Sequence, residues 1–406
     1  MGCIYGEQQA GKSWKDSLCH KMVMVGGFKE VLNMENMYYH PIWRVAVAIH
    51  VDDPIVFSRD EMGYTKTHDF LDQNFDTKGR QRLTQDHSID YLSMELTLTP
   101  EYDITLTNRA KCLKLLEDAG MQDILPTTMP PMTKATLKAA LADDEPLTPA
   151  QNSVRLADNG RFGWLSQTTH IGLAVATSIA QGLKPTQGTR KVSHMMYQWV
   201  RAHLDDGLLS KCDDYSGLSV SSDADWAGMH SVNGEIRSRT GMVIMYNGTP
   251  VLWYTGLQKT TSSQWVDGTE PTSEPAIARS SGNAELIAAS DTLTRALHFT
   301  FVSEELNIAV PRPIVVDLDA SAALGFLHNT GGGGKMKHID IREGWVQQIR
   351  DKGTVTFNKV DGKLIPANFM TKLLERLEYN HEYQRLALVG KPAEADPELD
   401  EDERSK

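Results

Sequence analysis

Residues 217–376 present an order of strands and helices that restricts the choice of fold. Three β-rich runs come first, over 217–223, 239–247 and 249–257. The later elements are a long helix, a strand, two helices, a strand and a last helix, at 283–305, 312–319, 320–329, 338–352, 353–360 and from about 365. Strands that are interrupted by helices in this way predict a layered α/β or α+β domain with a mixed sheet.

The first half of the chain predicts antiparallel hairpins followed by helices. Val45, Val47 and Ile49 alternate with small or polar residues. The β-rich pattern resumes at Ile55 after Asp52-Asp53-Pro54, so this stretch predicts a strand, a tight turn and a strand. A second hairpin, an amphipathic helix, a connector rich in Pro and Thr and a helical region are expected at 88–108, 109–121, 124–149 and 160–205. The fold class is therefore mixed, with α/β and α+β parts.

The composition is that of a globular protein with two or three domains. Of the 406 residues, 40% are apolar and 23% are charged, and the net charge is −12. This acidity argues against a protein with a broadly basic, nucleic-acid-coating surface, but it permits contact through one local groove. The four cysteines are scattered, which predicts a reducing intracellular compartment, cytoplasmic or nuclear. The sequence has no recognisable signal peptide or transmembrane segment, so no membrane partner is expected.

The segment YGEQQAGKSW, residues 5–14, matches the sequence pattern of a phosphate-binding loop, with Gly6 followed by Gly11-Lys12-Ser13. Such a loop needs a buried strand in front of it and a βαβ unit around it, so that backbone amides face the phosphates. Only residues 1–5 precede Gly6, and the next strong elements are antiparallel hairpins. A P-loop nucleotide hydrolase is therefore the least favoured alternative.

Other residues of that segment match a different sequence pattern. Tyr5-Gly6, Gln9-Ala10 and Trp14 resemble the Tyr-Gly-x-x-Gln-Ala-x-x-x-Trp segment of copia-type retrotransposon reverse transcriptases. HVDD at 50–53 stands where that family has Tyr-Val-Asp-Asp on a β-hairpin. The later segments SSDADWAG, SSGNAELIAASD, VDLDASAAL and ANFMTKLL resemble the family's ribonuclease H domain, in the same order. Up to about residue 376, the chain resembles the C-terminal part of a copia-type Pol polyprotein.

The resemblance implies a division of the chain into four segments. A truncated reverse transcriptase with the C-terminal palm and the thumb, a mostly helical connection, a ribonuclease H-like mixed-sheet domain and an acidic tail with a disordered end are expected at 1–130, 131–214, 215–376 and 377–406. The resemblance also implies an RNA–DNA hybrid as substrate, two Mg²⁺ or Mn²⁺ ions as cofactors and other Pol or Gag products as partners.

A ribonuclease H site needs carboxylates from separate elements around two divalent ions, one activating water and one stabilising the leaving oxygen. Magnesium prefers hard oxygen ligands, so Asp and Glu are the required residue types. The resemblance assigns the catalytic and metal-binding roles to Asp223, Glu285 and Asp319, which lie at strand ends and near a helix start. Asp225 and Asp317 lie two residues away from two of them and stay open as competing choices.

The fourth position of this site departs from the family pattern. The family has Ala-Asp-x-x-Thr-Lys just before its terminal helix, whereas ANFMTK places Asn368 at that position. A neutral amide can coordinate a cation through its oxygen but supplies no charge. Metal affinity and rate are therefore expected to be lower.

Asp52 and Asp53 are expected to be the remnant of a polymerase site. A polymerase palm needs carboxylates from two strands, and the family's other aspartate lies upstream of Tyr5. His50 also replaces the family's Tyr. We therefore expect this chain, by itself, not to polymerise DNA. The favoured function is metal-dependent hydrolysis of the RNA strand of RNA–DNA hybrids, and the alternative is a catalytically degenerate remnant that acts by binding.

Overall fold

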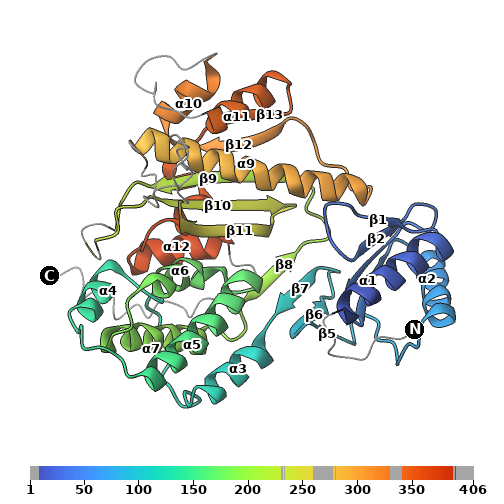
Figure 1. The fold of residues 1–406 in the computed structure, drawn as a ribbon, viewed down its shortest axis with the longest axis horizontal. Coiled ribbons are helices and arrows are strands. Elements are labelled where there is room, and N and C mark those ends of the chain that lie inside the picture. The colour runs from blue at the N-terminus through green and yellow to red at the C-terminus, as the bar shows by residue number, and fades with distance from the viewer. Residues whose placement is uncertain are drawn as a thin grey trace. The chain divides into compact units, whose positions relative to one another are not determined.

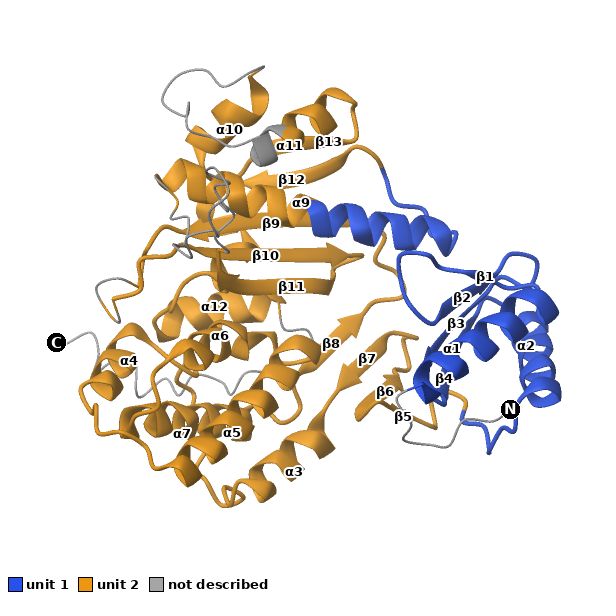
Figure 2. Cartoon of the chain, in the orientation of Figure 1, with its two compact units in different colours: residues 1–81, 294–311 blue, residues 82–293, 312–406 orange. Residues whose placement is uncertain are grey.

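The computed structural model describes residues 9–229, 232, 234–258, 278, 280–329, 341–386 and 389. The chain divides into two compact units, which are coloured separately in Figure 2. Unit 1 comprises residues 1–81 and 294–311, and unit 2 comprises residues 82–293 and 312–406. Both units mix helices with sheets, which confirms the predicted fold class. The division into four segments by family resemblance stays a prediction.

Unit 1 contains a four-stranded antiparallel sheet with helices packed on one face. Its elements are α1 (Ala10–His20), the π-helix η1 (Lys21–Val25), β1 (Lys29–Glu30), β2 (Met37–His40), β3 (Val45–His50), β4 (Asp53–Ser58) and α2 (Glu61–Asn74), with sheet order β1-β2-β3-β4. The alternation in β3 sends Val45, Val47 and Ile49 to one face. There they are buried in one cluster with Leu18 of α1 and Phe70 of α2, so apolar burial holds the helices to the sheet.

The turn between β3 and β4 is tighter than the sequence predicts. His50 pairs with Asp53, so Val51 and Asp52 alone form the turn and Asp53 already belongs to β4. Val51 has a φ of 58°, a strained value for a β-branched residue. The indole N–H of Trp14 donates a hydrogen bond of 2.6 Å to the Val51 carbonyl oxygen, which helps to hold this turn in place.

Unit 2 contains the mixed sheet that the sequence predicts. Its strands are β9 (Leu218–Asp225), β10 (Arg239–Tyr246), β11 (Thr249–Leu257), β12 (Ile314–Leu318) and β13 (Val355–Lys359), in the order β11-β10-β9-β12-β13. β9, β10 and β11 pair antiparallel, whereas β12 runs parallel to β9 and to β13. The accompanying helices are α9 (Ser281–Glu305), α10 (Ser321–His328) and α11 (Ile341–Asp351), and residues 281–293 of α9 lie along the sheet (Figure 1).

A second antiparallel sheet and a helical layer complete this part of unit 2. The strands are β5 (Ile89–Tyr91), β6 (Met94–Leu98), β7 (Ile104–Thr107) and β8 (Gly207–Ser210), and the helices are α3 (Arg109–Asp118), α4 (Lys134–Leu141), α5 (Pro149–Thr168), the 3₁₀ helix η2 (Ile171–Leu173), α6 (Ala174–Gly182) and α7 (Gln187–Ala202). The prediction of a plain connector over 124–149 is wrong, because Thr133 and Thr136 form a capping box that starts α4. Among the described residues, no helix has the length and apolarity of a membrane span.

The end of the chain also differs from the prediction. The expected last helix from about residue 365 is replaced by two 3₁₀ helices, η4 (Gly362–Leu364) and η5 (Pro366–Met370), and the last α-helix is α12 (Arg376–Leu386). Tyr379 and Tyr383 of α12 are buried in the same core as Trp199 of α7. Residues 377–386 are therefore part of the fold and not of a tail, because their aromatic side chains fill the core. The acidic run at 394–406 lies outside the described residues.

Candidate metal centre

Three carboxylates from three separate elements converge in unit 2. Asp223 lies on β9, Glu285 begins the second turn of α9, and Asp319 directly follows β12. One oxygen from each lies within 4.8 Å of the others. The topology explains the convergence, because β9 and β12 are parallel neighbours whose carboxyl ends meet at one sheet edge. Thr292 of α9 donates a 3.1 Å hydrogen bond to Ser222 of β9, which ties the helix to that strand.

Burial places Asp223 and Glu285 in an environment that disfavours their charge. Asp223 is 2% exposed and Glu285 is 8% exposed. Desolvation, reinforced by the neighbouring carboxylates of Asp223 and Asp319, raises the pKa of Glu285 to about 9. Desolvation also raises the pKa of Asp223, and the Lys372 ammonium and the Thr371 hydroxyl partly offset this effect.

The donor set fits a hard divalent cation. Oε2 of Glu285 is buried and has no hydrogen-bond partner among the described residues. An unpartnered buried carboxylate oxygen is costly, and a cation bound between the three side chains would remove this cost. Three carboxylates at this spacing are the oxygen ligands that Mg²⁺ and Mn²⁺ prefer.

Thr371 and Lys372 approach the cluster from the segment that follows η5. The Thr371 hydroxyl donates to Oδ2 of Asp223, and the Lys372 ammonium lies 3.6 Å from the same oxygen. Gly241 of β10, which pairs with Asp223 across the sheet, makes room for this segment. A Cβ at Gly241 would lie 2.5 Å from the Thr371 methyl group and 2.7 Å from the Ala367 carbonyl oxygen. The absence of a side chain at this position therefore allows the close approach.

Asn368, on η5, lies next to the cluster with both ends of its amide engaged. Its Nδ2 donates to the carbonyl oxygen of Gly362, and its Oδ1 accepts a 2.7 Å hydrogen bond from Lys372. Gly362 is also in close contact with Asp319, since a Cβ there would lie 2.6 Å from Oδ2 of that residue. The η4–η5 segment therefore forms one wall of the candidate centre.

The two competing aspartates lie outside the cluster. Asp317 of β12 accepts a 3.1 Å hydrogen bond from Asn358 on the neighbouring strand β13. Asp225 packs its carboxylate against Gly228, and burial raises its pKa. Within the described part of the chain, the group of three potential ligands contains Asp223 and Asp319 and neither of these neighbours. The catalytic roles of the clustered residues stay a proposal.

Asp52 and Asp53 are not brought together with other acidic groups in this way. Both are exposed at the β3–β4 turn of unit 1, and neither belongs to a group of three potential metal ligands among the described residues. Gly11-Lys12-Ser13 lie inside α1, and the sheet of unit 1 is antiparallel. The described part of unit 1 therefore lacks the parallel βαβ unit that a nucleotide-binding phosphate loop needs.

Sequence reasoning missed the contributions of Thr371 and Lys372. They stand three and four residues after Asn368 in the ANFMTK stretch. Residues at these separations share one face of a helical turn, so the spacing could have placed these side chains beside Asn368, although not in contact with Asp223. In the structure, the Thr371 and Lys372 side chains both reach Asp223 from the side where Asn368 lies.

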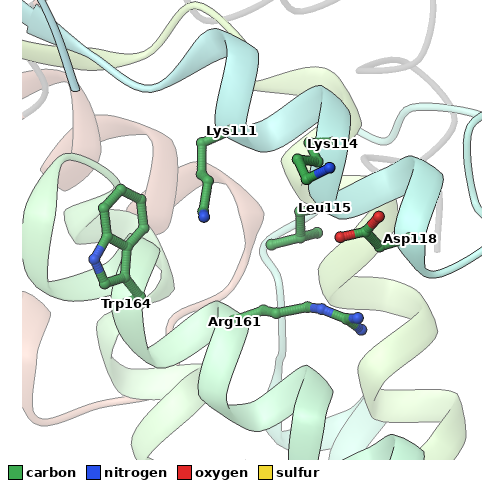
Figure 3. A pocket seen from close by; sticks show the side chains of 6 residues that line it. All are labelled: Lys111, Lys114, Leu115, Asp118, Arg161 and Trp164. Atoms are coloured by element: carbon green, nitrogen blue, oxygen red, sulfur yellow. The ribbon is translucent and has the colours of Figure 1, made fainter. Parts of the chain in front are cut away.

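A separate pocket of about 90 Å³ lies between α3 and α5. Figure 3 shows its lining, which consists of Lys111, Lys114, Leu115, Asp118, Arg161 and Trp164. The Lys111 ammonium lies 5.4 Å from the centroid of the Trp164 ring, a cation–π distance. Arg161 is oriented by a 3.0 Å ion pair with the buried Asp158. Cationic groups beside an aromatic ring are the means by which many proteins hold nucleic-acid strands.

The fold and the cluster together define a mixed α/β chain with a candidate divalent-metal centre at the edge of a mixed sheet. No family model matches the chain. The sequence is nevertheless similar to retrovirus-related Pol polyproteins of copia-type transposons, which confirms the resemblance identified from its motifs.

The similarity to these polyproteins extends over nearly the whole chain. The Pol polyprotein from transposon RE2 of Arabidopsis thaliana is 23% identical over 394 residues, or 96% of this chain and 25% of that protein. The polyprotein from transposon RE1 of the same plant is 22% identical over 96% of the chain and 25% of its own length. The polyprotein from transposon TNT 1-94 of Nicotiana tabacum is 23% identical over 93% of the chain and 27% of its own length. The chain thus spans about a quarter of the length of these relatives.

Among solved structures, the fold was matched to that of a foamy viral protease-reverse transcriptase in complex with an RNA/DNA hybrid. The TM-score is 0.39 and the identity is 13%, over 88% of this chain and 39% of the viral one.

Proposed function

We propose that this chain is a reverse transcriptase/ribonuclease H region that hydrolyses the RNA strand of RNA–DNA hybrids. The observation that carries the proposal is the convergence of Asp223, Glu285 and Asp319 within 4.8 Å at the edge of a mixed sheet. The relation to transposon Pol polyproteins supports it. Association with other Pol or Gag products, and a polymerase origin for Asp52 and Asp53, are further proposals from the same resemblance.

The three carboxylates would hold Mg²⁺ or Mn²⁺, which supplies an activated water and a Lewis acid for the scissile phosphate. The surrounding residues position these ligands. Thr371 fixes one oxygen of Asp223 by donating to it, and the backbone of Gly362 packs against the Asp319 carboxylate. Glu285, on α9, is itself largely shielded from solvent.

The direct test is cleavage of a labelled RNA strand by the full chain. We expect cleavage of the RNA when it is paired with DNA and magnesium is present. The same RNA as a single strand, and the hybrid with a chelator, serve as controls. Absence of cleavage at every magnesium and manganese concentration would favour the catalytically degenerate remnant that acts by binding.

The Asn368→Asp variant is expected to cleave faster and to need less magnesium. A carboxylate at this position adds a negative charge next to the cluster, and it cannot donate to the Gly362 carbonyl as the amide does. One added charge beside a divalent ion changes its affinity by about tenfold even at the dielectric constant of water. The measurement is the initial rate against magnesium concentration for both proteins. An unchanged magnesium requirement in an active protein would place residue 368 outside the metal centre.

Reversing the charge of the pocket between α3 and α5 is expected to weaken hybrid binding. The Lys111→Glu, Lys114→Glu double variant replaces two cations that line this pocket, and phosphate contacts of this kind dominate affinity for nucleic acid. We expect a loss of about tenfold or more at low salt, and a smaller one at high salt. Fluorescence anisotropy of a labelled hybrid measures it. Lys138→Glu, a single exposed charge reversal on α4, is the control outside the pocket, and an equal loss there would exclude a specific role of the pocket.

A further inference from the structure

The Lys372 ammonium lies beside one of the three carboxylates of the cluster. It is 3.6 Å from Oδ2 of Asp223 and 2.7 Å from Oδ1 of Asn368. The Thr371 hydroxyl donates to the same oxygen of Asp223. One of the three carboxylates therefore already has a cation and a hydroxyl donor from its own chain.

Asn368 holds this ammonium in place without adding a charge of its own. Its Nδ2 donates to the Gly362 carbonyl oxygen, so the amide cannot rotate without losing that hydrogen bond. This orientation presents Oδ1 to Lys372. The oxygen through which an amide could coordinate a divalent ion thus already accepts a hydrogen bond from the ammonium.

We propose that Lys372 is a tethered cation that competes with the divalent ion at this centre, and that Asn368 fixes it there. The proposal rests on the proposed function for the presence of a divalent ion. Because an ammonium and a divalent ion repel each other, binding of the ion requires Lys372 to withdraw from Asp223. Lys372 is half-exposed, so it can move into solvent without disturbing the core. The competition sets the metal affinity of the free protein.

Manganese binding to the full chain tests this competition without any nucleic acid. Lys372→Gln removes the charge and keeps much of the side-chain length, and we expect the dissociation constant for Mn²⁺ to fall about tenfold. Lys372→Arg keeps the charge and should retain the weak affinity of the unchanged chain. Lys352→Gln removes an exposed charge directly after α11, before the start of β13 and away from the three carboxylates, and it should leave the affinity unchanged. Isothermal titration calorimetry gives the constants, and thermal melts check that each variant is folded.

The outcomes separate this inference from the proposed function. Equal manganese affinity in the unchanged chain and in Lys372→Gln overturns the competition, as does undetectable binding in both, even if the hybrid is cleaved. Tighter binding in Lys372→Arg as well as in Lys372→Gln also overturns it, because charge would then not be the cause. Tighter binding in Lys372→Gln alone supports the competition, and it does so even if no variant cleaves a hybrid.

Discussion

Asp319→Asn is expected to slow hybrid cleavage by about 100- to 1,000-fold and to leave the fold intact. Loss of a charged metal ligand removes several kcal/mol of stabilisation from the transition state, and each 1.36 kcal/mol corresponds to about tenfold in rate. Asp319 follows the end of β12 and is partly exposed, so the substitution opens no cavity in the core. Asp223→Asn and Glu285→Gln are expected to cause the same loss. Single-turnover rates on a labelled hybrid, with thermal melts, measure both parts of this expectation.

Asp317→Asn is the matched control for this experiment. It removes the same charge two residues earlier, on β12, but its side chain accepts a hydrogen bond from Asn358 on β13 and lies outside the cluster. We expect its rate to stay within about threefold of the unchanged chain, as is usual for a substitution outside the reacting centre. A large loss in Asp317→Asn with none in Asp319→Asn would show that Asp317, and not Asp319, belongs to the centre.

The mixed sheet of unit 2 could be predicted because its elements are long and their order is restrictive. Three successive β-rich runs and two later strands separated by helices leave little choice of pairing. The predictions that were wrong concern segments whose structure depends on short-range contacts. The Thr133–Thr136 capping box starts α4 inside a stretch rich in Pro, and 3₁₀ turns replace the expected helix around Asn368.

The composition of the candidate centre was only partly accessible from the sequence. Asp223 and Asp319 could be placed at strand ends, and the carboxyl ends of neighbouring parallel strands meet at one edge of a sheet. The contact between Thr371 and Asp223 joins residues 148 positions apart. It depends on the close packing that Gly241 permits, and no local pattern encodes a contact of this kind.

Asp206→Asn is expected to stabilise the protein above neutral pH. Asp206 is 4% exposed and accepts a hydrogen bond from the Tyr383 hydroxyl of α12. Burial, together with the neighbouring charge of Asp205, raises its pKa from 3.8 to about 7. A carboxyl group whose pKa is raised by folding makes its full contribution to stability at pH values below the pKa that the group has in the unfolded chain. This contribution is lost as the pH rises from 3.8 to about 7. Over this range the unfolded chain has released the proton that the folded protein still binds, so a rise in pH favours the unfolded chain.

Asparagine has nearly the same shape as aspartate, accepts the Tyr383 hydrogen bond through its amide oxygen and carries no charge that must be desolvated. Its advantage over Asp206 should grow between about pH 4 and about pH 7 and then level off, at a few kcal/mol. The expected rise in melting temperature is several degrees at about pH 8. Thermal unfolding of both proteins from about pH 4 to about pH 8 gives the difference at each pH. Asp205→Asn, at an exposed neighbour that pairs with Arg109, should change stability by less than about 1 kcal/mol. A difference that is independent of pH would show that Asp206 is ionised in the folded protein across this range, and that its contact with Tyr383 outweighs the cost of burial.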